Sequence, residues 1–416
     1  MKRKLTIALF ILLSWYASRA QTVTRLDEIL QLIDTANPAA KMYEADIRSL
    51  NEAAKGARSW MPTEFATGLW MAPYNPRLWQ KGQNGTAGMG QYMLSVQQML
   101  PNAKKQDAEA TYLQWMSAPQ KERKNNAINE LHAEAKKQYY GWIILKKKLS
   151  TLDENAKILD FMIKDAEIRY RNGLDKLNAY YKAKAELGDI MQSRLALQNE
   201  IDQKRFRLNT LMNRNKGQIF DIDTIYIIKD YAAAASVTGS LNSKSDIRAL
   251  DSEIQLSGLQ QEAERTKALP EFGIRYEHMF GFGGLPMQYT LMGMVKVPIG
   301  RGKRAFKANV ESLRWKSEEL YQQKQMLLNE AAGEVAGIIG DIATKKQQVK
   351  LFEDNILPAL HKNFEVIKPS YQQNTEQLFT LLDAWNTLNK TQTEYLNQVQ
   401  QLLNLQVELE RILEIK

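Results

Sequence analysis

A stretch in the second half of the chain combines two glycines with several cations, VKVPIGRGKRAFKANV (295–310). Glycine-rich loops can cradle a phosphate with their backbone amides, and a lysine at the end of the loop contacts it. Such a loop has the wider spacing G-x-x-x-x-G-K-[ST], whereas Gly300 and Gly302 stand only two positions apart and no hydroxyl follows Lys303. The stretch therefore does not predict a phosphate site.

The residues that most often carry catalysis are few and scattered. His132, His278 and His361 are far apart and lack the H-x-x-x-H spacing of a metal-binding helix. Asp221 and Asp223 form no paired carboxylate signature, and the absence of cysteine excludes thiolate chemistry and disulfides. We therefore expect no enzyme, no cofactor and no resident metal site.

Methionine, whose thioether is a soft metal ligand, is concentrated in and near the predicted strands. Thioethers suit Cu(I), but methionine also fills irregular packing, so either role fits this composition. Met292 and Met294 alternate with apolar residues and share one face of a predicted strand. The methionines in or near the predicted strands are Met71, Met89, Met93, Met99, Met279, Met287, Met292 and Met294.

The first residues, 1–20, have the pattern of a secretory signal peptide. A basic start is followed by an apolar core and a small-x-small site before Gln21. The leader carries four cations and no acid, so the net charge falls from +9 to +9 − 4 = +5 in the exported chain. This mild charge does not suggest nucleic-acid binding, and no later apolar window is long enough for a transmembrane helix.

The sequence contains an internal repeat. MPTEF (61–65) corresponds to LPEFG (269–273), and the segments before and after them follow in the same order with nearly the same spacing. The repeat predicts a first structural unit over 21–212 and a second over 245–416. Residues 213–244 are then the linker between the repeats, an equatorial region.

Each repeat contains a segment with the period of a β-strand. Phe272, Ile274 and Tyr276 alternate with more polar residues, which predicts one apolar face and one polar face. We expect β-hairpins at about 62–100 and about 270–299. Strands of about ten residues with alternating faces suit a membrane-spanning barrel.

The period becomes helical after each hairpin. Leu145, Leu152 and Leu159 recur every seven residues. Some 65 residues of helix would span on the order of 100 Å and need neighbours along their length, which implies a bundle of several chains. Pro119 and Pro358 predict breaks in these helices.

Four strands in one chain cannot close a barrel, because two edges would remain open and lipid does not tolerate unpaired edges. Three chains would supply twelve strands, which satisfies the even number and the size that a channel needs. The alternative from the pattern alone is a soluble periplasmic helical protein with two small hairpins.

The whole layout resembles the TolC-type outer-membrane efflux proteins. The resemblance implies an α+β fold in which long antiparallel helical hairpins form a tunnel through the periplasm. The two β-hairpins of each chain would contribute to a shared, trimeric, twelve-stranded barrel among outer-membrane lipids. It also implies a periplasmic adaptor protein and an inner-membrane pump of the RND or ABC type as partners. The segments that carry the likeness are LDEILQLIDTANP (26–38), RYRNGLDKLNAYYKAKAEL (169–187), SDIRAL (245–250) and VKVPIGRGKR (295–304).

The resemblance also implies functional residues at the two helical tips, where the family docks its adaptor. Tyr170, Gly173 and Leu174 match the family's Tyr-x-x-Gly turn. At the second tip Tyr371 matches, but Asn374 replaces the glycine. Asparagine is the next-best residue in the left-handed conformation, so we expect the turn to form. The two tips are expected near 170–176 and near 371–378.

Two further sets of residues follow from the family pattern. Asp383 stands where the family keeps an acidic residue facing the tunnel, so three copies would form a narrow anionic ring and a gate. The first repeat has Lys182 at this position. The strand-to-helix junctions are marked by Pro101 in the first repeat and by Pro298, Gly300 and Gly302 in the second.

Together these features predict the exit duct of a tripartite efflux or type I secretion-like system in the cell outer membrane. The duct would be a passive conduit that opens when its periplasmic helical tips move. The alternative function is a soluble periplasmic coiled-coil adaptor or scaffold protein. The transported substrate remains open among metal ions, drugs and polypeptides.

Overall fold

A computed structural model describes residues 23–174, 176–231, 241–300 and 302–415. The predicted signal peptide at 1–20 lies outside the described residues. The chain divides into two compact units that each draw on both predicted repeats. A helical unit comprises Met1–Met42, Lys124–Lys244 and Leu328–Lys416, and a hairpin unit comprises Tyr43–Arg123 and Ser245–Leu327.

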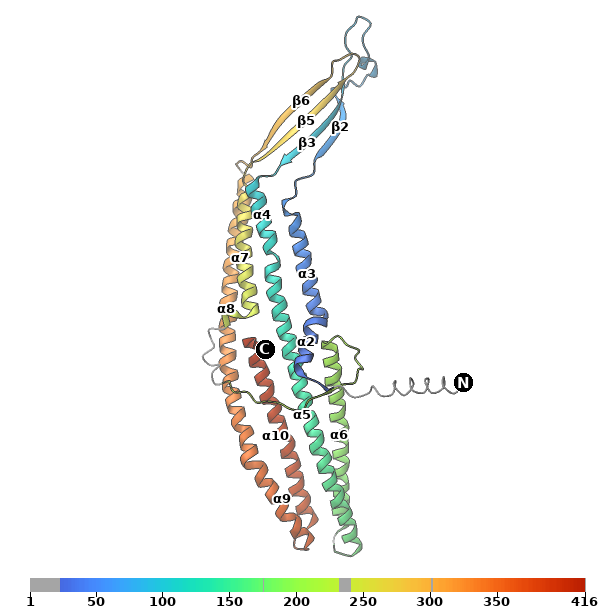
Figure 1. Ribbon diagram of the computed structural model, residues 1–416, viewed down its shortest axis with the longest axis vertical. Helices are drawn as coiled ribbons and strands as arrows, with labels where there is room; N and C mark the ends of the chain where they lie inside the picture. The colour runs from blue at the N-terminus through green and yellow to red at the C-terminus, as the bar shows by residue number, and fades with distance from the viewer. Residues whose placement is uncertain (1–22, 175, 232–240, 301, 416) are drawn as a thin grey trace, which may run out of the picture. The chain divides into compact units, whose positions relative to one another are not determined.

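The hairpin unit contains a four-stranded antiparallel sheet (Figure 1). Its strands are β2 (Glu64–Trp70), β3 (Gln91–Leu100), β5 (Glu271–Gly281) and β6 (Gln288–Lys296), in the order β2-β3-β5-β6. The two predicted β-hairpins are therefore confirmed. Strand β3 of the first hairpin pairs with β5 of the second, which joins the two repeats in one sheet and leaves β2 and β6 as its edges.

Side chains alternate between an apolar and a polar face of this sheet, as strand geometry requires. On one face Tyr92 lies opposite Phe280, whereas on the other Glu277 lies opposite both Ser95 and Thr290. The large side chains of the apolar face are exposed. They include Phe65 (77%), Phe272 (52%), Ile274 (52%), Leu291 (67%) and Val295 (60%).

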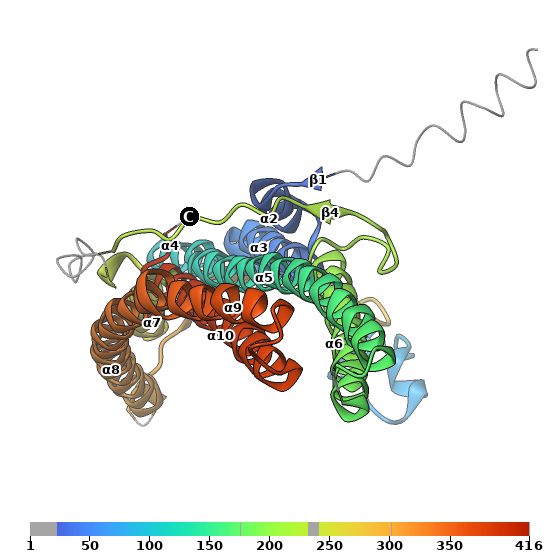
Figure 2. The ribbon, with the colours of Figure 1, turned by 90° about the horizontal axis from the view of Figure 1, so that it is seen from below.

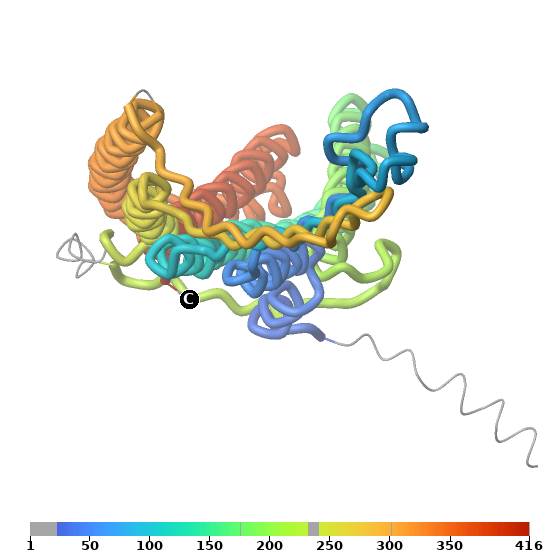
Figure 3. Tube along the Cα trace, turned by 90° about the horizontal axis from the view of Figure 1, so that it is seen from above, coloured from blue at the N-terminus to red at the C-terminus, as the bar shows by residue number. Residues whose placement is uncertain are grey.

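The loops at one end of the sheet pack on each other within the hairpin unit. Figure 3 shows them together, the first in blue. The ring of Trp79, in the short helix η2 (Pro76–Trp79), stacks on Phe282 with 5.2 Å between the centroids. The amide of Gly88 donates to the carbonyl of Gly283 over 2.9 Å. Gly283 has φ +56°, and a Cβ atom there would lie 2.6 Å from the Trp79 carbonyl oxygen, so only glycine fits.

Helices complete the hairpin unit. They are the end of α3 (Pro38–Lys55), η1 (Gly56–Arg58), α4 (Ala103–Trp115), α7 (Ser245–Thr266) and the beginning of α8 (Gly302–Leu351). Helix α7 packs against α8 through small polar residues. The hydroxyl of Ser257 donates to the carbonyl of Leu313 over 3.1 Å, and Ser317 donates to Ser257 over 2.9 Å.

The helical unit consists of two long antiparallel helical hairpins, as predicted, and the linker between the repeats. Figure 2 shows the two hairpins from below. Their helices are α5 (Ser117–Arg171) and α6 (Leu177–Leu211) in the first, and the end of α8, α9 (Leu357–Gln372) and α10 (Leu378–Leu413) in the second. Helix α2 (Leu26–Ala36) and the short parallel pair β1 (Val23–Thr24) and β4 (Asp221–Ile222) complete the unit. Every helix among the described residues is too short or too polar to cross a bilayer.

Apolar side chains at heptad spacing form the core of the helical unit. Leu145, Leu152 and Leu159 of α5 are 2%, 7% and 0% exposed, so the predicted seven-residue period marks the buried face of this helix. Leu152 and Leu159 belong to a cluster near the tips, and Leu145 packs with α2 and the linker. Since both helical hairpins contribute to the tip cluster, it holds the two hairpins of one chain together.

The two predicted prolines coincide with helix breaks. Helix α4 ends at Trp115, four residues before Pro119, and the helix restarts as α5. Before Pro358 the chain forms a π-helical turn, η4 (Phe352–Ile356). A proline has no amide hydrogen, and its ring clashes with the carbonyl four residues earlier, so the regular helix is interrupted there.

Candidate functional site

The first helical tip turns through a left-handed glycine. Helix α5 ends at Arg171, and Gly173 has φ +72°. The amide of Gly173 donates to the Tyr170 carbonyl and that of Leu174 to the Arg169 carbonyl, each over 2.9 Å. These two bonds form the Schellman motif that ends a helix and satisfies its last carbonyls. Tyr170 and Leu174 are 44% and 58% exposed.

The second tip has the same hydrogen bonds around a different residue. Asn374 has φ +62°. Its amide donates to the Tyr371 carbonyl over 3.1 Å, and the amide of Thr375 donates to the Ser370 carbonyl over 3.0 Å. Asparagine therefore supports the turn that glycine makes in the first tip, as the sequence led us to expect. Tyr371, in contrast to Tyr170, is only 2% exposed.

One arginine joins the two tips of the chain. Arg169, at the end of α5, donates a hydrogen bond to the side-chain oxygen of Asn374. Its guanidinium carbon lies 4.4 Å from the centre of the Tyr371 ring, which is a cation–π contact. Sequence reasoning missed this contact, because nothing in the RYRNG segment identifies a partner 205 residues away.

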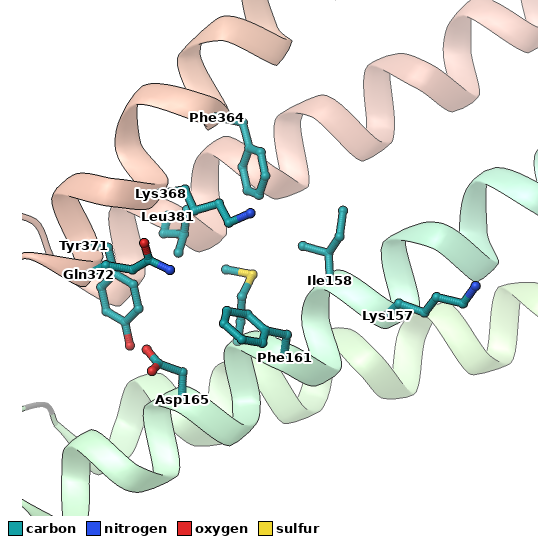
Figure 4. A pocket seen from close by; sticks show the side chains of 10 residues that line it. Lys157, Ile158, Phe161, Asp165, Phe364, Lys368, Tyr371, Gln372 and Leu381 are labelled. Carbon is teal, nitrogen blue, oxygen red and sulfur yellow. The ribbon is translucent and has the colours of Figure 1, made fainter.

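A cavity of about 240 Å³ lies behind this bridge, between α5 on one side and α9 and α10 on the other (Figure 4). Its walls are apolar, with Phe161 and Met162 from α5 facing Phe364 and Tyr371 from α9. Polar groups stand at its margin, among them Asp165, Lys368 and Gln372. The two tip hairpins are thus joined at the bridge and incompletely packed just behind it.

The predicted gate residue, Asp383, lies on the exposed side of α10 between buried Leu382 and Ala384. Within the described part of the chain its carboxylate has no hydrogen-bond or ion-pair partner. Lys182, its counterpart in the first repeat, places its amino group 5.1 Å from the ring of Phe379, one helical turn before Asp383.

The two strand-to-helix junctions use different caps. After Pro101, the side chain of Asn102 accepts from the Lys104 amide over 3.0 Å and caps α4. After Pro298, Gly300 takes φ +59° and Gly302 begins α8. Lys104, Lys303 and Arg304 are exposed, but Lys105 pairs with the buried carboxylate of Glu271.

A buried carboxylate ties the linker to the helices, and it too was missed from the sequence. Glu410 of α10, 5% exposed, accepts from Lys136 over 2.7 Å and from Lys229 and Tyr231 over 2.6 Å each. Burial alone would raise the pKa of Glu410, but these three hydrogen bonds outweigh it and lower the pKa. Burial and the bond to Glu410 raise the pKa of the Tyr231 hydroxyl.

We compared the chain with known protein families. Residues 29–214 match the model of the family described as outer membrane efflux protein. The match covers somewhat less than half of the chain and shows a likeness to this family over these residues. The match supports an outer-membrane efflux protein, and it does not support the soluble adaptor or scaffold. This family is one of channels and not of enzymes.

Solved structures of outer-membrane channels share the fold over nearly the whole chain. VceC from Vibrio cholerae is 17% identical, with a TM-score of 0.73, and the match covers 93% of this chain and 95% of that one. CusC is 13% identical, with a TM-score of 0.75 and coverage of 94% and 92%. The open state of MtrE from Neisseria gonorrhoeae is 14% identical, with a TM-score of 0.72 and coverage of 94% and 88%. No curated protein sequence matches this one.

Proposed function

We propose that this protein is the outer-membrane exit duct of a tripartite efflux or type I secretion-like system. The observation that carries the proposal is the four-stranded sheet. Its apolar face is exposed, its other face is polar, and β2 and β6 are open edges. Lipid does not tolerate unpaired backbone groups at such edges, so the sheet is a fragment of a closed barrel.

Three copies complete the barrel in this proposal. Edge β6 of each copy pairs with β2 of the next, and three sheets of four strands close a ring of twelve. The helices also need neighbours, because large apolar side chains of the helical unit are exposed. These include Phe161 (55%), Ile168 (60%), Leu195 (74%) and Val366 (67%). In a trimer they would pack between copies and form the wall of a tunnel.

The tips are the proposed docking surface for a periplasmic adaptor, which connects the duct to an inner-membrane pump of the RND or ABC type. Exposed Tyr170 and Leu174 support this role. Because the sequence contains no cysteine, Leu174→Cys offers a single attachment point for a photo-crosslinker. We expect it to capture the adaptor in cells, while Leu195→Cys on the side of α6 does not. Equal capture from both positions would remove the tips as the docking site.

The proposed gate is the pair of tips. Arg169 holds the two helical hairpins of a chain together through Asn374 and Tyr371, and the channel opens when this contact breaks. Asp383 would then form an anionic ring that attracts cations. We expect Asp383→Ala to weaken block by divalent cations in planar bilayers, with Asp165→Ala as a comparison outside the ring. Unchanged block would exclude Asp383 from the conducting path.

The main proposal is tested by locating the protein and weighing its assembly. We expect it in the outer-membrane fraction, to be extracted by detergent as a trimer, and to form discrete conductances in planar bilayers. A deletion strain should retain substances that the intact system exports. Recovery in the soluble periplasm as a monomer would refute the duct. Such a duct is a passive path in which the pump does the work.

A further inference from the structure

All five methionines of the four strands lie on the polar face of the sheet. They are Met93 and Met99 of β3, Met279 of β5, and Met292 and Met294 of β6. The strand register places them in line with Ser95, Glu277 and Thr290. Methionine is an apolar residue, so burial in lipid would favour the opposite face, which instead carries aromatic and aliphatic side chains. Their placement therefore needs another explanation than apolar packing.

Two of these methionine side chains reach into the space that the missing side chain of a glycine leaves. Gly273 of β5 pairs with Met99 of β3 on one side and with Met294 of β6 on the other. A Cβ atom at Gly273 would lie 2.5 Å from the sulfur of Met99 and 3.0 Å from the methyl carbon of Met294. The two side chains thus reach over the same point of the backbone. A second cross-strand pair, Met93 and Met279, lies about 20 Å farther along the strands.

The buried carboxylates of this face are engaged by cations of the protein itself. Glu277 accepts from Arg275 over 2.6 Å, and Glu271 pairs with Lys105 and lies 4.0 Å from Lys296. No group of three or more histidine, aspartate or glutamate side chains suited to a metal occurs among the described residues. The donors that remain beside Gly273 are neutral: the backbone carbonyl of Gln98 and the thioethers of Met99 and Met294, which are soft ligands. Hard ions such as Mg²⁺ and Ca²⁺ prefer oxygen.

We propose that Met99 and Met294 bind a soft monovalent cation, Cu(I) or Ag(I), over Gly273. Thioether sulfur is selective for such ions, and flexible methionine side chains can close around an ion without moving the strands. Neutral ligands leave the charge of the ion uncompensated, so the site suits transient rather than permanent binding. The further statement that the protein also exports this ion rests on the proposed duct function. Binding of the ion at Gly273 does not depend on that function.

Binding is tested on the purified full-length protein in detergent. Cu(I) is supplied under reducing conditions and partitioned against a chromophoric chelator, and X-ray absorption reports the ligand atoms. We expect sulfur ligands, and we expect Met99→Leu/Met294→Leu to lower the Cu(I) affinity by about tenfold or more, because leucine keeps the volume and removes the donor. Met287→Leu is the matched control, in the loop between β5 and β6 and 70% exposed. It should bind as the unaltered protein does.

A second pair of variants separates ligand geometry from ligand identity. Gly273→Ala keeps every methionine but places a methyl group where the thioethers meet, so it should also weaken Cu(I) binding. Gly293→Ala, in β6 on the opposite face with no atom within 4 Å of the added group, should not. Equal affinity in the unaltered protein and the double leucine variant, or a shell of only nitrogen and oxygen, overturns the proposal.

Conductance of the same preparations keeps the two proposals apart. A protein that binds Cu(I) through Met99 and Met294 but forms no channel refutes the duct and leaves the metal site intact. A protein that conducts but shows no thioether-dependent binding refutes the metal site and leaves the duct intact.

Discussion

The two helical tips of this chain share a backbone and differ in their side chains. Both end a long helix with the same pair of hydrogen bonds around a left-handed residue, Gly173 in one and Asn374 in the other. Tyr170 is 44% exposed, whereas the equivalent Tyr371 is 2% exposed and lies beneath Arg169. The two repeats thus share the backbone turn, but their tip side chains make different contacts. Tyr371 of the second tip packs in the core, and Arg169 of the first tip contacts Tyr371 and Asn374.

The largest expected difference between the tips lies in their tyrosines. Tyr371→Ala removes a buried ring from the tip cluster and should destabilise the tip by about 3–5 kcal/mol. Tyr170→Ala removes an exposed ring and should cost less than about 1 kcal/mol. Hydrogen exchange of the amides in α9 and at the start of α10 measures both. Equal protection in the two variants would show that the tips are equivalent.

A smaller difference is expected at the left-handed positions. Asn374→Ala loses both the left-handed preference and the acceptor of Arg169, at a cost of about 2–3 kcal/mol. Gly173→Ala loses only the conformational preference, about 1–2 kcal/mol. Asn374→Gly restores the backbone but not the hydrogen bond, so it should fall nearest to the unaltered protein. If Asn374→Gly were as unstable as Asn374→Ala, the left-handed backbone preference would not be the main contribution of Asn374 to the stability of the tip.

The smallest expected effect is a pH dependence that sets the tips apart from the linker. At the tips Arg169 contacts the neutral side chains of Asn374 and Tyr371, whereas at the linker the carboxylate of Glu410 holds Lys229 and Tyr231. Burial alone would raise the pKa of Glu410, but its hydrogen bonds outweigh burial and hold this pKa below the ordinary value of 4.5. Its contribution is therefore fully present above that value and is lost as pH falls through the lower folded pKa.

The corresponding measurement is hydrogen exchange at acidic pH, corrected for the intrinsic rates. Protection of residues 226–231 should fall as the pH drops below the ordinary carboxyl pKa of 4.5, and Glu410→Gln should remove this dependence. The amides of the two tip turns should show no matching loss. A parallel loss at the tips would mean that a titrating group also controls the tips.

Much of the fold could be predicted, because period and repetition are local properties of a sequence. The alternation through Phe272, Ile274 and Tyr276 predicted β5, and the seven-residue spacing of Leu145, Leu152 and Leu159 predicted the buried face of α5. The duplication predicted two hairpins but not that β3 pairs with β5. That pairing joins residues about 180 positions apart, and no local signal specifies it.

The side-chain contacts of the candidate site were less accessible to sequence reasoning. The family pattern pointed to Tyr170 and Tyr371 but not to their different burial, which depends on how α5 packs against α9. Arg169 stood next to a predicted residue and was missed, since its partners are distant in the chain. Glu410 lies within an ordinary helical pattern, and its contacts with Lys136 of α5 and with the linker, which distinguish it from a surface acid, join residues far apart in the chain.

The most direct test of the account is the single-channel conductance of the Arg169→Ala protein in planar bilayers. We expect the unaltered protein to conduct poorly because its tips are held together, and Arg169→Ala to raise the conductance or the open fraction. Arg171→Ala is the matched control. It removes a neighbouring exposed arginine whose ion-pair partner among the described residues is Glu167 on its own helix, so it should leave the channel unchanged. Identical conductance in all three proteins would contradict a gate formed by the helical tips.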